Sequence, residues 1–244
     1  MQHSHPGKKP TKVITEPYLS GSMTDATTFK SALAFFGGQV ALMLFYLFIG
    51  SMMVMDSQVF TIVVNVLLVA VAWYACYQRG AVSGAEGVYK GEILHQRRER
   101  GHEVTAADTA RCYHPLKGLI SALLGTSPIF LCACALALTA QEVVPGAANE
   151  VLTVTDFLRM VVRMALLPLI HFSGLNNTAA HLVLEQLSPL LVLLPAGMYA
   201  LGYSRGPAIR TRIHTDIYLG KRRQLKKQKR ENAQRSHRGP DAPR

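Results

Sequence analysis

Five polar residues between positions 171 and 185 form the first group whose side chains could support chemistry: His171, Asn176, Asn177, His181 and Glu185. His181 and Glu185 are four residues apart, so they share one face if the segment is helical. An imidazole beside a carboxylate can relay a proton or supply two ligands to a metal ion. His171, His181 and Glu185 are therefore candidates for a ligand, proton or metal site.

A simpler interpretation of the same group is solvation and capping at a membrane surface, where polar side chains cost little. The spacing specifies no third metal ligand, so no metal site is assigned. The sequence contains no Walker loop, no G-x-S-x-G motif and no H-E-x-x-H motif. We therefore expect no catalytic residue and no cofactor.

The second group is a run of cations near the C-terminus. Seven of the ten residues from 221 to 230 are basic: Lys221, Arg222, Arg223, Lys226, Lys227, Lys229 and Arg230. Such cations attract anionic lipid headgroups by about 1 kcal/mol each near a membrane surface, so these seven are lipid-binding candidates. A solvated tail that only fixes topology is the simpler alternative. Because the tail lacks a nucleic-acid-binding motif, no nucleic acid partner is expected.

Four long stretches contain no Asp, Glu, Lys or Arg: residues 31–55, 57–78, 118–141 and 186–204. A bilayer core about 30 Å thick is crossed by about 20 helical residues. Each stretch has about that length and is rich in Leu, Val, Ala, Ile, Phe or Met. The sequence therefore predicts an all-α polytopic membrane protein with four transmembrane helices arranged as two hairpins.

An outer segment, residues 150–181, separates the third and fourth spans. Its apolar pattern is interrupted by Asp156, Arg159 and Arg163, which fall on one face of a helix. A helix with one charged face is typical of a segment lying in the membrane interface. A fifth span over 154–172 stays open as an alternative.

The distribution of basic residues predicts the orientation. Four spans place 24 of the 26 Lys and Arg residues on one side of the membrane, and cytoplasmic loops carry such an excess. Both termini are therefore expected in the cytoplasm of a plasma or bacterial inner membrane. The parts on that side are a mobile leader (1–30), a loop with short helices (79–117, with one helix ending at Gly101) and a basic tail (205–244).

Small residues four apart favour close helix packing, either within the chain or against another membrane protein or a second copy. The pairs are Ala34 with Gly38, Gly37 with Ala41, Ser121 with Gly125, Ala133 with Ala137, and Ala196 with Ala200. Gln39 and Asn65 are candidates for hydrogen bonds between spans.

These features favour a non-catalytic multi-pass membrane protein that acts as a subunit or assembly scaffold of a membrane complex. One alternative is a small oligomeric transporter or channel, which the prolines within the spans (Pro128, Pro189 and Pro195) would suit. The second is an intramembrane enzyme, or a metal or proton site, using His171, His181 and Glu185.

Overall fold

The computed structural model describes residues 13–50, 57–140, 153–174 and 177–237, with side chains described as far as residue 233. Every regular element in these ranges is α-helical: α1 (Ala26–Ile49), α2 (Gln58–Glu99), α3 (Ala106–Ala110), α4 (Lys117–Thr139), α5 (Val154–Ala165), α6 (Leu167–Ser173), α7 (Thr178–Ser204) and α8 (Gly206–His237). Four of the described helices are long and apolar enough to cross a membrane: α1, α2, α4 and α7 with its continuation α8. The predicted all-α polytopic fold is therefore confirmed.

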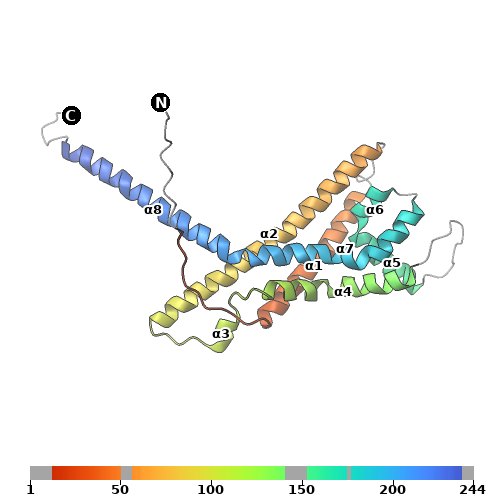
Figure 1. Ribbon diagram of the computed structural model, residues 1–244, viewed down its shortest axis with the longest axis horizontal. Helices are drawn as coiled ribbons and strands as arrows, with labels where there is room; N and C mark the ends of the chain where they lie inside the picture. Colours follow the sequence, from red (N-terminus) through yellow and green to blue (C-terminus); the bar gives the residue numbers. More distant parts are fainter. Residues whose placement is uncertain (1–12, 51–56, 141–152, 175–176, 238–244) are drawn as a thin grey trace, which may run out of the picture.

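The spans pack in an order that differs from their order in the chain. α7 lies between α2 and α4, and α4 also packs against α1 (Figure 1). The third and fourth spans thus form the expected packed pair. The first and second spans meet over a smaller area: the side chains of Tyr46 and Ala72 pack together and Arg79 reaches the backbone of α1, but few parts of the two backbones lie close to each other. The short connection expected between them falls mostly on residues 51–56, outside the described residues.

α2 is longer than the sequence predicts. A loop with a separate helix was expected after residue 78, yet α2 runs without a break to Glu99 and ends before Gly101, which has φ of +80°. The glycines in this stretch, which look like helix breakers, allow backbone contact instead. A Cβ at Gly80 would lie 2.0 Å from the carbonyl oxygen of Tyr199, and one at Gly84 would lie 2.2 Å from that of Tyr203.

α8 follows α7 after a single residue, Arg205, at the position where the sequence predicts a helix end. Its first residue, Gly206, packs against the backbone of Gly84 on α2. Beyond this crossing point α8 leaves the bundle and projects away from it (Figure 1). The end of the molecule that carries α3 and the root of α8 is called the α8 end below, and the opposite end, which carries α5 and α6, is called the α5 end.

Residues 13–25 differ from the mobile leader expected from the sequence, because they run along the helices of the α8 end. The amide of Leu19 donates to Gly91 O at 3.2 Å, and that of Gly21 donates to Tyr113 O at 2.8 Å. Asp25 caps α1 and accepts a hydrogen bond from Lys117 Nζ at 2.9 Å. Burial opposes ionisation of Asp25, but the bonds from Lys117, Thr27 and Thr28 outweigh it and lower its pKa to about 2.

The apolar core has a distinct part at each end of the bundle. At the α8 end it is aromatic, with Tyr113 stacked on Tyr203 at 5.3 Å between ring centroids and Phe35 beside Tyr199 at 4.9 Å. At the α5 end it is aliphatic and joins α5 to α4 and α7 through residues such as Val162. The bundle is therefore tied together on both sides of its midplane.

Candidate functional sites

The polar residues of the α5 end are positioned by α5, a 12-residue helix that crosses the ends of the spans. Thr153 and Asp156 form a capping box that starts it. Part of its apolar surface, including Leu158 and Val162, packs on the aliphatic core, whereas Val154, Phe157 and Met160 are exposed. Its polar face turns inward as well, because the Arg159 side chain is only 15% exposed and contacts α7. This orientation differs from an interfacial helix whose charged face meets the headgroups.

Glu185 on α7 is the partner of this polar face. Arg159 Nε donates to Glu185 Oε1 at 3.0 Å, and Arg163 Nη2 lies 2.6 Å from the same oxygen. The Glu185 side chain is 5% exposed. A buried carboxylate held by two guanidinium groups is stable only while both partners remain, so Glu185 fastens α5 onto α7.

The three sequence candidates at this end are not all brought together. His181 and Glu185 line the same small pocket, together with Arg163, whereas His171 on α6 is buried outside its lining. His171 Nδ1 and His181 Nε2 are buried and have no hydrogen-bond partner within the described residues. A ligand, proton or metal role for the three residues stays a prediction.

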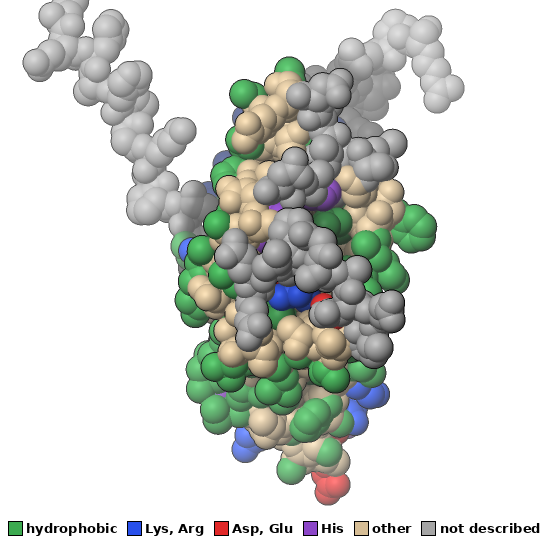
Figure 2. Space-filling view, turned by 90° about the vertical axis from the view of Figure 1, so that its right-hand side faces the viewer, with side chains coloured by type: hydrophobic (Ala, Val, Ile, Leu, Met, Phe, Trp, Pro, Cys, Tyr) green, Lys and Arg blue, Asp and Glu red, His purple; other side chains and the backbone are tan. Residues whose placement is uncertain are grey.

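Two further observations bear on that role. No three His, Cys, Asp or Glu side chains gather closely enough for a metal ion anywhere in the described ranges. Figure 2 looks onto the α5 end and shows a mostly apolar and neutral surface, with a small group of basic and acidic side chains near its centre. Glu185 itself is occupied by its two arginines and is not a free base.

A second buried carboxylate, Glu92 on α2, lies at the α8 end and is absent from the candidates chosen by sequence. Arg210 Nη2 hydrogen-bonds to its Oε2, and His214 Nε2 lies 2.9 Å from its Oε1. The Arg210 guanidinium also sits 4.8 Å from the centre of the Tyr89 ring. Burial opposes ionisation of Glu92, but Arg210 and His214 outweigh it and lower its pKa. This cluster clamps the root of α8 to α2.

The seven basic residues of the tail lie on the projecting part of α8, and all of them are exposed. At about 100° per residue they spread around most of the helix circumference. Ile217 and Leu225, which could have dipped into a membrane surface, are 51% and 58% exposed and form no continuous apolar stripe. The projecting half of α8 is therefore a cationic rod without an apolar face.

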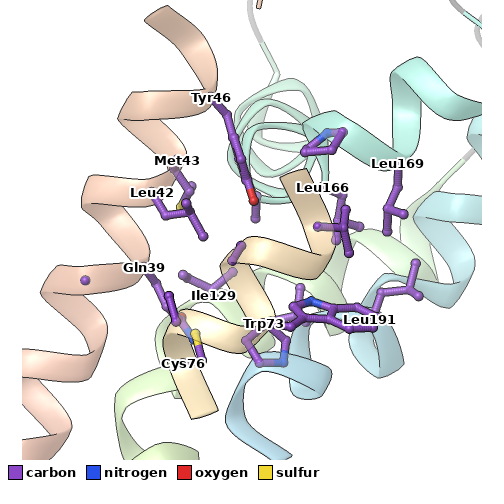
Figure 3. A pocket seen from close by; sticks show the side chains of 18 of the residues that line it. Gln39, Leu42, Met43, Tyr46, Trp73, Cys76, Ile129, Leu166, Leu169 and Leu191 are labelled. Carbon is purple, nitrogen blue, oxygen red and sulfur yellow. The ribbon is translucent and has the colours of Figure 1, made fainter. Parts of the chain in front are cut away.

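A cavity of about 160 Å³ separates α1 from α2 (Figure 3). Its walls are mainly aliphatic and aromatic, with Leu42 and Met43 on one side and Trp73 on the other. Arg79 lines the cavity at the α8 end, while Leu166 and Leu169 line it near α5. No sequence pattern indicates this cavity, because two spans joined by a short connection are expected to pack against each other.

Of the two polar residues expected to join spans, Gln39 lines this cavity. Its Nε2 donates to Thr126 Oγ1 on α4 at 3.0 Å, which confirms the predicted bond between helices. Asn65 Nδ2 donates to Thr61 O within its own helix.

The small-residue pairs differ in their surroundings. Ser121 and Gly125 pack inside the bundle, where a Cβ at Gly125 would lie 2.5 Å from Ala32 O. Gly37 faces open space.

Comparison with known proteins finds no relative of this chain. No protein-family model matches the chain, no curated protein matches it, and no solved structure matches its fold.

Proposed function

We propose that this chain is a non-catalytic subunit of a membrane-associated assembly, in which the four spans form an anchor and α8 binds an acidic surface of a partner protein. The proposal rests on two properties of α8, its attachment to the bundle and its charge. Its root is clamped to α2 by Glu92, Arg210 and His214. Its outer half is exposed and strongly basic.

The geometry favours a protein partner over a flat lipid surface. A helix that lies in a membrane interface needs an apolar face opposite its cations. The outer half of α8 has cations around most of its circumference and projects from the bundle (Figure 1). A helix that is polar on all sides suits a role in which it bridges two bodies through solvent. Anionic lipid headgroups remain the alternative ligand of these seven residues.

The orientation that goes with this proposal has both termini in the cytoplasm of a plasma or bacterial inner membrane. It follows from the excess of Lys and Arg at the α8 end. The cationic rod would then face cytoplasmic partners, and electrostatic steering would speed their association.

The test is affinity purification of the full chain in mild detergent, with two matched variants. One carries Lys226→Gln, Lys229→Gln and Arg230→Gln on α8. The other carries Arg97→Gln, Arg98→Gln and Arg100→Gln, which removes the same charge from the exposed end of α2. We expect an acidic protein to co-purify with the wild type and the α2 variant, and to be lost from the α8 variant.

Two results would contradict the proposal. Equal loss of the partner from both variants would mean that only net charge matters. Loss of co-purified anionic phospholipid from the α8 variant, with no change in bound proteins, would assign the seven residues to lipid binding.

A further inference from the structure

We propose that the cavity between α1 and α2 binds one acyl chain of an anionic phospholipid, whose headgroup is held by Arg79. This inference does not depend on the function of α8. It concerns a different surface, which opens between two membrane spans and not into the solvent.

The position of the cavity matches the layout of a phospholipid. Arg79 immediately follows the second charge-free stretch, 57–78, and therefore lies where that span leaves the apolar core of the membrane. From there the cavity extends toward α5, between Leu42 and Met43 of α1 and Ala72 and Trp73 of α2 (Figure 3). A headgroup at Arg79 would thus have its chain parallel to the spans.

The chemistry of the lining selects an alkyl chain with a negative end. Arg79 is the one charged residue among those that line the cavity, and it forms no ion pair with a carboxylate in the described part of the chain. Its guanidinium lies against Gly38, where a Cβ would be 2.1 Å from Nη1, and its Nη2 donates to Ala34 O at 3.4 Å. Basic pockets between spans on the cytoplasmic side commonly bind anionic headgroups.

The size of the cavity limits the occupant. An apolar cavity of about 150 Å³ holds a molecule the size of benzene, so about 160 Å³ suits a section of one alkyl chain and excludes a bulky solute. Within a bilayer, a water molecule would find no hydrogen-bond partners on the apolar walls of this cavity. A lipid chain is therefore the occupant that the surroundings can supply.

Trp73 provides a direct probe, because it lines the cavity and is the single tryptophan of the chain. The full chain is reconstituted in phosphatidylcholine vesicles that contain a small fraction of lipid with brominated acyl chains. The brominated lipid is either phosphatidylglycerol or phosphatidylcholine with identical chains. We expect brominated phosphatidylglycerol to quench Trp73 at a several-fold lower fraction of the lipid.

Two variants and their controls define the site. Arg79→Gln should abolish the preference for phosphatidylglycerol, whereas Lys30→Gln, which removes a cation outside the cavity lining, should keep it. Ala72→Phe should fill the cavity and reduce quenching by both lipids, whereas Ala70→Phe, on an exposed part of α2, should not.

The inference is overturned if both brominated lipids quench the wild type equally, since that is the behaviour of ordinary surrounding lipid. It is also overturned if Arg79→Gln keeps the preference, a result that stands even if Ala72→Phe fails to fold. Absence of quenching by either lipid would mean that protein covers the opening, for example a second copy of the chain.

Discussion

Glu185 and Glu92 are two buried carboxylates that each bind two basic side chains, and the comparison between them explains much of the architecture. Glu185 lies at the α5 end and binds Arg159 and Arg163, 26 and 22 residues before it in the chain. Glu92 lies at the α8 end and binds Arg210 and His214, 118 and 122 residues after it. Glu185 holds the nearby helix α5 against α7, and Glu92 holds the distant helix α8 against α2.

The same ionic arrangement therefore serves two mechanical purposes. Loss of the first clamp would release a segment that contributes part of its apolar surface to the core, so it should weaken the whole fold. Loss of the second would free a helix whose outer half is already exposed, so its effect should be local.

Glu185→Ala should lower the free energy of unfolding by about 3 kcal/mol, because it removes the charged hydrogen bonds from Arg159 and Arg163 and leaves Arg159 with only its longer ion pair to Asp156, at 3.5 Å. Unfolding in mixed micelles with increasing denaturing detergent measures this change. Gln186→Ala is the matched control, since residue 186 is exposed on the same helix. Equal stability of the two variants would show that the cluster around Glu185 is not a clamp.

Glu92→Gln should act locally and increase the opening of α8 from α2. A loss of about 2 kcal/mol from charged hydrogen bonds corresponds to about 30-fold faster amide exchange. Hydrogen–deuterium exchange over residues 206–215 should show this increase, with α4 and α7 unchanged. Glu86→Gln, at an exposed site on the same helix, is the control. Faster exchange throughout the bundle would remove the distinction between the two clamps.

Asp25 extends the comparison to a carboxylate with one cation, Lys117, and gives a pH dependence. Because folding lowers the pKa of Asp25 from 3.8 to about 2, its contribution is complete above about pH 4 and is lost as the pH falls toward 2. The shift corresponds to about 2 kcal/mol. Stability measured from pH 5 to pH 2 should therefore fall more steeply in the wild type than in Asp25→Asn. Parallel curves of stability against pH for the two proteins would show that the ion pair of Asp25 and Lys117 does not stabilise the fold.

His214→Ala should have the smallest effect, about 1 kcal/mol of local stability, because Arg210 still holds Glu92 through two nitrogen atoms. Exchange over residues 206–215 should increase less than in Glu92→Gln. Arg210→Ala should exceed His214→Ala in the same measurement. The reverse order would mean that the imidazole, and not the guanidinium, carries the clamp.

Much of the membrane architecture was predictable because it depends on local composition. Charge-free stretches of about 20 residues mark the spans whatever their partners are. The spacing of Asp156, Arg159 and Arg163 indicates one helix face, and these residues lie in α5. These signals act within one or two helical turns.

The contacts between helices were not predictable from such signals. His181, four residues away, looked like the partner of Glu185, but the cations come from α5 across a break in the helices. Gly80 and Gly84 looked like loop residues, since glycine is a poor helix former, and their use only becomes visible once α7 and α8 pack against α2. Arg210 and His214 share a helix face, yet nothing local points to Glu92.

If α8 is a fixed rod mounted on the membrane bundle, its outer half keeps a constant distance from the end of α2. The most direct test is the distance between spin labels on noncanonical amino acids at positions 99 and 224, at the end of α2 and on the outer half of α8, measured by double electron–electron resonance in nanodiscs. We predict one narrow distance distribution in the wild type that broadens in Glu92→Gln. A broad distribution in the wild type that Glu92→Gln leaves unchanged would contradict the claim.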